Sequence, residues 1–369
     1  MSTHLHRLLL ATALLLSGCA QSGGSVGYYW QSLRGHLALL QAAEPVQQWL
    51  DAPDTPEPLR TRLALAQKAR AYAVTDLALP DNASYRRYAQ LERRAAVWNV
   101  VAAGPYSLQL HRWCFPITGC IGYRGYFDEA DARAEAAQLA ATGLEVSVYG
   151  VPAYSTLGYS NWLGGDPLLS TFIAWPEGDF VRLLFHELAH QQVYASGDTA
   201  FNESYATAVE RLGVASWLQR HSTPAARAQF AASEERRAQF RALTSATRQR
   251  LATIYESNTA LTPDYQALSA IKLEAMQQFH ADYARLRQGW LAAGAQGTQL
   301  VALDRWVREA NNASFAAQGA YDDLVPAFMA LFEREGRDWP RFHAAVRALA
   351  GLPQAERDAA LRALAPVGA

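Results

Sequence analysis

Apolar residues recur at helical spacing along most of this 369-residue chain. In its first part the pattern predicts three helical segments, separated by a proline-rich stretch and by Pro80: 28–50, 57–78 and 81–103. Beyond residue 221 the pattern is helical again, with a long antiparallel pair over 224–255 and 263–290 and shorter helices over 299–317, 322–335 and 338–349. We therefore expect a mostly α-helical protein.

The period of the pattern changes in the middle of the chain. Residues 106–113 and 145–149 alternate between apolar and polar in the manner of strands, and an alanine-rich helix over 128–142 separates them. A third apolar stretch, 168–175, leads directly into a segment that is apolar on almost every side. These observations predict an α+β fold with a small sheet before a buried helix, an N-terminal region over 28–220 and a helical C-terminal region over 221–369.

The buried segment contains the sequence His-Glu-Leu-Ala-His at residues 186–190. On a helix, His186 and His190 leave the same face one turn apart, so both imidazoles can bind a single metal ion. Glu187 is rotated by about 100° and can reach an open fourth position as a general base. The alternative is a buried helix whose histidines bond to neighbouring polar groups. A divalent metal would offset the cost of burying these groups.

A third ligand is expected from the next helix. Gly197 is a typical helix stop and Asp198 or Thr199 a typical N-cap, after which apolar residues return at helical spacing. Glu203 and Glu210 lie on one polar stripe of this second helix, which a turn allows to fold back against the first. The predicted site is His186, His190 and Glu203, with Glu210 orienting a ligand imidazole. The alternative is that both glutamates lie on a solvated face.

The order His-Glu-Leu-Ala-His followed by Asn-Glu-Ser-Tyr-Ala resembles the gluzincin metallopeptidases. Four further segments are similar to a bacterial zinc aminopeptidase lipoprotein family: Tyr123–Phe127, Ala153–Gly158, Asp166–Thr171 and Asn311–Ala313. The resemblance covers nearly all of the mature chain. It implies a zincin-like core with Zn²⁺ on His186, His190 and Glu203, and Glu187 as the catalytic base. The Gly-x-Met-x-Asn signature of gluzincin aminopeptidases, which grips a substrate amino terminus, is absent from the sequence.

Water attack on a peptide carbonyl also requires a donor that stabilises the oxyanion. Tyr154, in a turn before the metal-binding helix, and Tyr321, in a late helix, are our first candidates, and His111 and Tyr123 are further ones. For each tyrosine the alternative is a packing role in the core.

The amino terminus predicts a lipid anchor. Arg7 supplies a positive charge, residues 8–16 are apolar, and Leu-Ser-Gly-Cys19 fits the bacterial lipobox. We expect a signal peptide over 1–18, a lipidated Cys19 and a flexible tether over 19–27. Ala20 resembles the sorting signal for the outer membrane, with the protein facing the periplasm. An ordinary secretory signal cut elsewhere is the alternative.

Cys114 and Cys120 are the remaining cysteines. In an oxidising envelope compartment they are expected to form a disulfide, with metal binding as the alternative. The net charge of −1 and the absence of a basic run argue against a nucleic-acid partner.

The sequence thus predicts a zinc peptidase with a peptide substrate, an aminopeptidase in our first interpretation. The alternatives are a zinc endopeptidase and an envelope binding or assembly lipoprotein with a structural metal. Substrate preference, protein partners and oligomeric state are not predicted by any of these patterns.

Overall fold

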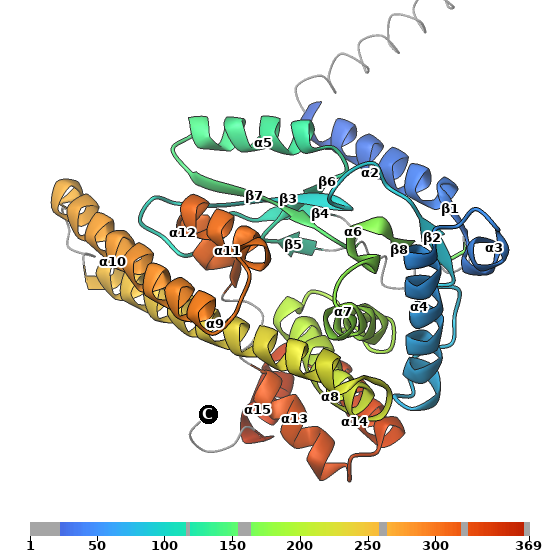
Figure 1. Ribbon diagram of the computed structural model, residues 1–369. Coiled ribbons are helices and arrows are strands. Elements are labelled where there is room, and N and C mark those ends of the chain that lie inside the picture. The colour runs from blue at the N-terminus through green and yellow to red at the C-terminus, as the bar shows by residue number, and fades with distance from the viewer. Residues whose placement is uncertain (1–22, 116–118, 154–163, 258–263, 319–323, 365–369) are drawn as a thin grey trace, which may run out of the picture.

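Helices make up most of the protein, as predicted. The computed structural model describes residues 23–115, 119–153, 164–257, 264–318 and 324–364 (Figure 1). Its helices are α2 (Gly23–Gln41), α3 (Val46–Asp51), α4 (Glu57–Thr75), α5 (Glu129–Ala141), α6 (Ser170–Ile173), α7 (Glu177–His190), α8 (Thr199–His221), α9 (Pro224–Ser257), α10 (Tyr265–Ala292), α11 (Gly297–Glu309), α12 (Asn312–Gln318), α13 (Val325–Arg334), α14 (Trp339–Ala350) and α15 (Gln354–Leu364).

The strands form small sheets. They are β1 (Ala43–Pro45), β2 (Arg87–Ala89), β3 (Val97–Ala103), β4 (Trp113–Phe115), β5 (Gly119–Ile121), β6 (Arg124–Tyr126), β7 (Glu145–Val151) and β8 (Leu168–Leu169). The antiparallel sheet β6-β3-β7 has β3 at its centre, and Trp98 pairs with Tyr126 on one side and with Gly150 on the other. A second sheet has the order β1-β2-β8, and β4 pairs with β5. The α+β fold with a small sheet before the motif helix is thus confirmed.

Both faces of the sheet around β3 are covered (Figure 1). Trp98 and Val100 pack against Ala132 of α5 on one face. Val101 and Ala103, of opposite parity, pack against Ala313 of α12 on the other. Since successive side chains of a strand point to opposite faces, this apolar strand buries both of its sides.

One predicted helix, 81–103, is wrong. Its residues form β2 and β3 instead, with turns before and between them. The segment Val97–Ala103 is apolar almost throughout, and periodicity alone does not separate a buried strand from a buried helix in such a run. The segment is a strand because β3 pairs with β6 on one side and with β7 on the other.

Other boundaries also differ. The strand expected over 106–113 is replaced by turns and a single bridge between Ala103 and Leu110, with β4 beginning only at Trp113. The predicted helix 28–50 is divided by β1, and the predicted helix 299–317 is divided between α11 and α12. Residues 168–175 contain the two-residue strand β8 and the short helix α6. Helix α2 begins at Gly23, inside the segment expected as a tether.

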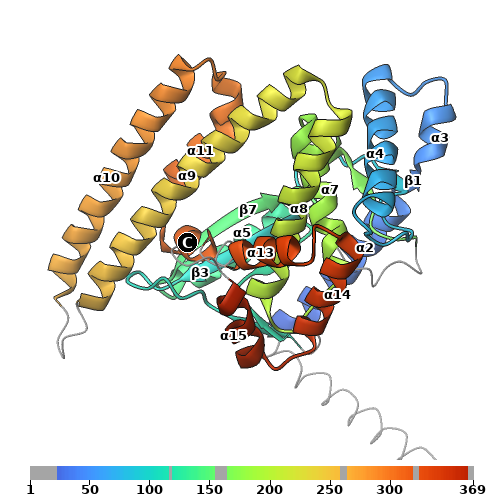
Figure 2. The ribbon, with the colours of Figure 1, turned by 90° about the horizontal axis from the view of Figure 1, so that it is seen from below.

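Helix α7 lies in the main hydrophobic core. This core contains Phe185 and Leu188 of α7, Tyr205 and Trp217 of α8, and residues from α4, α6 and α13 to α15. Helices α9 and α10 form the predicted long antiparallel pair (Figure 2), with a second core between them and α11. The helix that carries the sequence His-Glu-Leu-Ala-His is therefore held by packing on several sides.

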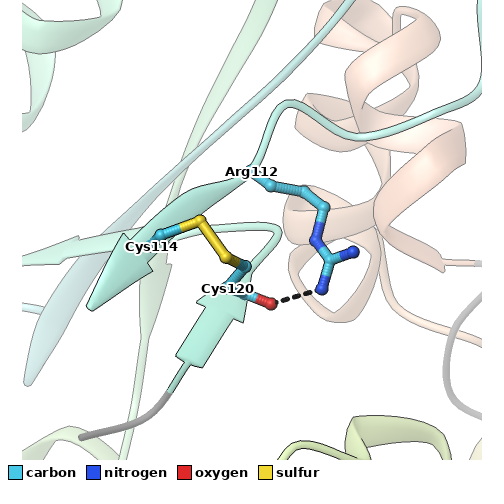
Figure 3. The surroundings of a disulfide bond; sticks show 3 residues. All are labelled: Arg112, Cys114 and Cys120. Carbon is cyan, nitrogen blue, oxygen red and sulfur yellow. Dashed lines mark hydrogen bonds between the residues drawn. A yellow bond between two sulfur atoms is a disulfide. The ribbon is translucent and has the colours of Figure 1, made fainter. Parts of the chain in front are cut away.

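The predicted disulfide between Cys114 and Cys120 is present (Figure 3). It joins β4 to β5, where the two cysteines are paired across the strands. Arg112 Nη2 donates a hydrogen bond of 2.7 Å to the carbonyl oxygen of Cys120. Within the described residues, none of the helices has the length and apolar character needed to cross a membrane.

Candidate metal centre

The turn between α7 and α8 is fixed by its own polar residues. The Asp198 side chain caps α8 by accepting a hydrogen bond from Phe201 N at 3.0 Å. Asn202 accepts from Ala195 N at 2.7 Å and donates to Ala195 O at 2.8 Å. These bonds hold α8 against α7, as the sequence predicted from Gly197 and Asp198.

A glycine permits the close approach of α8 to its neighbours. A Cβ atom on Gly213 would lie 2.7 Å from Leu77 Cδ1 and 2.9 Å from Phe185 Cδ2, well inside van der Waals contact. Phe185 directly precedes the first histidine of the motif. The packing at Gly213 therefore sets the distance between the two helices that carry the predicted ligands.

The three predicted ligands come together. His186 Nε2 and His190 Nε2 are 3.1 Å apart, and Glu203 places Oε2 at 3.3 Å from the first and Oε1 at 3.7 Å from the second. Ligand atoms on all three residues lie within 4.8 Å of one another, so the group could hold a metal ion. Glu203 is therefore not on a solvated face, and its side chain is only 23% exposed.

Glu210 orients His186. Its Oε2 lies 2.9 Å from His186 Nδ1, and Arg182 Nη1 lies 3.9 Å from its other oxygen. Burial raises the pKa of Glu210, but the contacts with His186 and the charge of Arg182 outweigh it and lower that pKa. Since a carboxylate accepts, His186 Nδ1 carries the donated proton, and its Nε2 lone pair then faces the other ligands.

The electrostatics of the group favour a positive charge, either a proton or a metal ion, between its members. Burial lowers the pKa of His186, but Glu203 and Glu210 raise it well above its ordinary value. Burial raises the pKa of Glu203, but the contacts with His186 and His190 outweigh it and lower that pKa. If His186 is neutral, its Nε2 lone pair faces the Glu203 carboxylate and is repelled by it. Either a proton or a metal ion between these atoms removes the repulsion.

The donor set fits zinc. Tetrahedral Zn²⁺ with bonds of about 2.0–2.2 Å needs ligand atoms about 3.3–3.6 Å apart. The two imidazole Nε2 atoms are 3.1 Å apart, and Glu203 Oε2 lies 3.3 Å from that of His186, while the other oxygen of Glu203 lies 3.7 Å from that of His190. Two imidazoles and one carboxylate also match the ligand chemistry of zinc sites that keep an open position. His190 Nδ1 is buried without a hydrogen-bond partner among the described residues.

The charges of the ligand residues and of a buried acidic residue act on Glu187. Burial raises the pKa of its carboxyl group, and the charges of Glu203 and Asp166 act in the same direction, whereas His186 and His190 oppose them. Asp166 is 1% exposed, and its Oδ2 accepts a hydrogen bond from Gln191 Nε2 at 3.3 Å. A carboxylate of raised pKa is a stronger base, which suits the role predicted for Glu187.

The charge of Glu203 acts on two tyrosines. Burial raises the pKa of Tyr123, and the charge of Glu203 contributes in the same direction. Glu203 also raises the pKa of Tyr149, which lies on β7, after the larger effect of burial. Tyr123 was a predicted candidate. Tyr149 was missed, because alternation along a strand does not show which charged groups its side chains approach.

The structure bears on only one of the remaining predicted residues. Tyr154, Tyr321 and Cys19 lie outside the described residues. His111 is exposed, and its ring lies 4.7 Å from that of Trp113, centroid to centroid, in an edge-on arrangement.

Comparison with known proteins supports the peptidase class that this site suggests. The family model described as "Putative aminopeptidase" matches residues 27–361, which is most of the chain. The protein belongs to this family. No curated protein and no solved structure matches the chain.

Proposed function

We propose that the protein is a zinc-dependent peptidase with a zincin-like core, and specifically an aminopeptidase. The convergence of His186, His190 and Glu203 next to the half-buried Glu187 is the observation that carries this proposal. Membership in the aminopeptidase family supports the peptidase class. The zinc ion and the preference for a free amino terminus are our own assignments.

The protein's residues have distinct roles in this proposal. Bound zinc would supply a Lewis acid that polarises a water molecule and the scissile carbonyl. Glu187 takes the proton from the attacking water on its carboxylate and passes it to the leaving amine. Glu210 holds the His186 imidazole in one orientation through Nδ1. Tyr123 and Tyr149, whose pKa values the charge of Glu203 raises, are our candidates for the oxyanion donor.

Cleavage of paired peptides tests the proposal. The wild type and Glu187→Gln are incubated with a peptide library in which each sequence occurs with a free and with an acetylated amino terminus. We expect the wild type to cut free peptides from the amino terminus and to lose this activity with a zinc chelator. Equal cutting of acetylated peptides would identify an endopeptidase. Absence of cleavage by the zinc-loaded wild type would contradict the enzyme assignment.

We also propose that Cys19 anchors the protein to the periplasmic face of the outer membrane. The lipobox sequence supports this, and the disulfide between Cys114 and Cys120 suits an oxidising compartment. Expression of Cys19→Ser followed by membrane fractionation tests it. Release of the variant to a soluble fraction is expected, and retention in the outer membrane would contradict the lipid anchor.

A further inference from the structure

A cavity of about 410 Å³ lies along strand β7, away from the three metal ligands in sequence. Residues 147–150 of β7 form one wall, and α11 contributes the facing wall. In Figure 1, β7 lies between α5 and the pair α11 and α12. The charged side chains that line the cavity are four arginines and one glutamate: Arg94, Arg133, Arg305, Arg308 and Glu309.

Strand β7 has one unpaired edge at this cavity. In the described part of the chain it pairs with β3 alone. The Val146 carbonyl accepts a hydrogen bond of 2.9 Å from Asn311 Nδ2, so it points away from β3. Because backbone groups alternate in direction with a period of two, the N–H and C=O groups of Val148 and Gly150 point the same way. Both residues line the cavity, which therefore offers an extended peptide a strand to pair with.

The positive charge of the cavity is only partly compensated. Arg94 and Arg133 share the single carboxylate of Glu129. Arg308 lies 3.9 Å from Glu309, and Arg305 forms no ion pair with any described residue. Guanidinium groups bind carboxylates with two parallel hydrogen bonds, so such a surface complements acidic side chains.

The charge of Glu203 acts on one residue of this cavity. Tyr149 lines the cavity, and Glu203 raises its pKa, after the larger effect of burial. An extended chain lying along β7 would run past Tyr149.

We propose that this cavity binds an acidic stretch of an extended peptide, whose backbone pairs with the open edge of β7 while its carboxylates contact the arginines. The assignment rests on the proposed function, since it makes the acidic peptide the substrate class of the same site. The cavity's arginines, and Arg305 above all, then select the substrate.

Binding can be measured without turnover in the zinc-loaded full-length Glu187→Gln protein. The probes are a fluorescent peptide with a run of glutamates and the same peptide with glutamines in their place. The test variant adds Arg305→Gln and Arg308→Gln. The matched control adds Arg248→Gln and Arg250→Gln, two exposed positions on α9 that do not line the cavity and change the net charge equally.

We expect the acidic peptide to bind roughly tenfold more tightly than the amide peptide, and the cavity variant to lose most of this preference while the control keeps it. Rising salt should weaken the preference. If the cavity variant preferred the acidic peptide as strongly as the protein with intact arginines does, the proposal would be overturned. It would also be overturned if anionic lipid vesicles bound through the cavity arginines and the acidic peptide did not bind. Acid-selective binding by a protein that cleaves no peptide would contradict only the proposed enzymatic function.

Discussion

His186 Nδ1 and Glu210 Oε2 lie 2.9 Å apart, which joins the metal-binding helix to the middle of the next one. The bond fixes which nitrogen of His186 is free to bind a metal. Glu210 is itself 12% exposed, so water does not replace it easily. The orientation of the first motif histidine thus depends on a residue that binds no metal itself.

Glu210→Ala should weaken zinc binding roughly 10- to 100-fold, because His186 Nδ1 loses its acceptor and its ring can rotate. Competition with a chromogenic chelator measures this affinity. Glu210→Gln keeps an acceptor oxygen and should lose less. Glu274→Ala, at an exposed position on α10, is the control. An unchanged affinity in Glu210→Ala would show that Glu210 has no part in the site.

Much of this site could be predicted from sequence because its information is local. The spacing of His186 and His190 defines one helical face, and Gly197 with Asp198 marks the turn that returns Glu203 to them. Tyr149 and Arg305 could not be predicted in this way. Their positions depend on how β7 and α11 pack in three dimensions.

The fold was predictable to a similar extent. The long amphipathic pair α9 and α10 was found almost to its ends, since its period is sustained over many residues. In contrast, Val97–Ala103 is apolar except for Asn99, and its pairing with both β6 and β7 is what distinguishes it from a buried helix. The spacing of apolar residues along the sequence does not show which strands will pair with this one.

Gly213→Leu should destabilise the protein by about 1–3 kcal/mol, because the new side chain meets Leu77 and Phe185. It should also weaken zinc binding by moving α8 away from α7. Urea unfolding and chelator competition measure the two effects. Gly289→Ala is the matched control, since nothing lies near its Cβ position in α10, and it should stabilise slightly. Wild-type stability in Gly213→Leu would mean that the helices are not in tight contact there.

Acid should destabilise the fold through His343. Burial lowers the pKa of this histidine to about 4, against an ordinary value of 6.5. Its Nδ1 accepts from Tyr205 Oη at 2.8 Å, and its Nε2 donates to the Leu77 carbonyl oxygen at 2.8 Å. Between pH 6.5 and 4, His343 is therefore protonated in the unfolded chain but neutral in the folded protein. Stability is lost as pH falls through this window.

From pH 7.5 to pH 5 this group should remove about 2 kcal/mol from the free energy of unfolding. Urea unfolding of the wild type and of His343→Gln at both pH values measures it. Glutamine can both accept and donate at this position but does not titrate, so its pH dependence should be flatter. An identical pH dependence in both proteins would exclude His343 as the cause.

Replacing both Cys114 and Cys120 with serine should lower the free energy of unfolding by about 2 kcal/mol. Without the disulfide the unfolded chain is no longer closed into a small loop, so its conformational entropy rises. Urea unfolding measures the loss. The zinc affinity should not change, since both cysteines lie outside the ligand group. A large fall in zinc affinity would instead assign the cysteines a role in the metal site.

Zinc content and peptide cleavage measured on the same samples of wild type and Glu187→Gln test the central claim most directly. We predict one zinc ion in both proteins, cleavage by the wild type, and a loss of roughly 100-fold or more in Glu187→Gln. His190→Ala should lose the ion itself. Zinc bound equally by wild type and Glu187→Gln, with equal cleavage by both or by neither, would contradict the assignment of Glu187 as the base of a zinc peptidase.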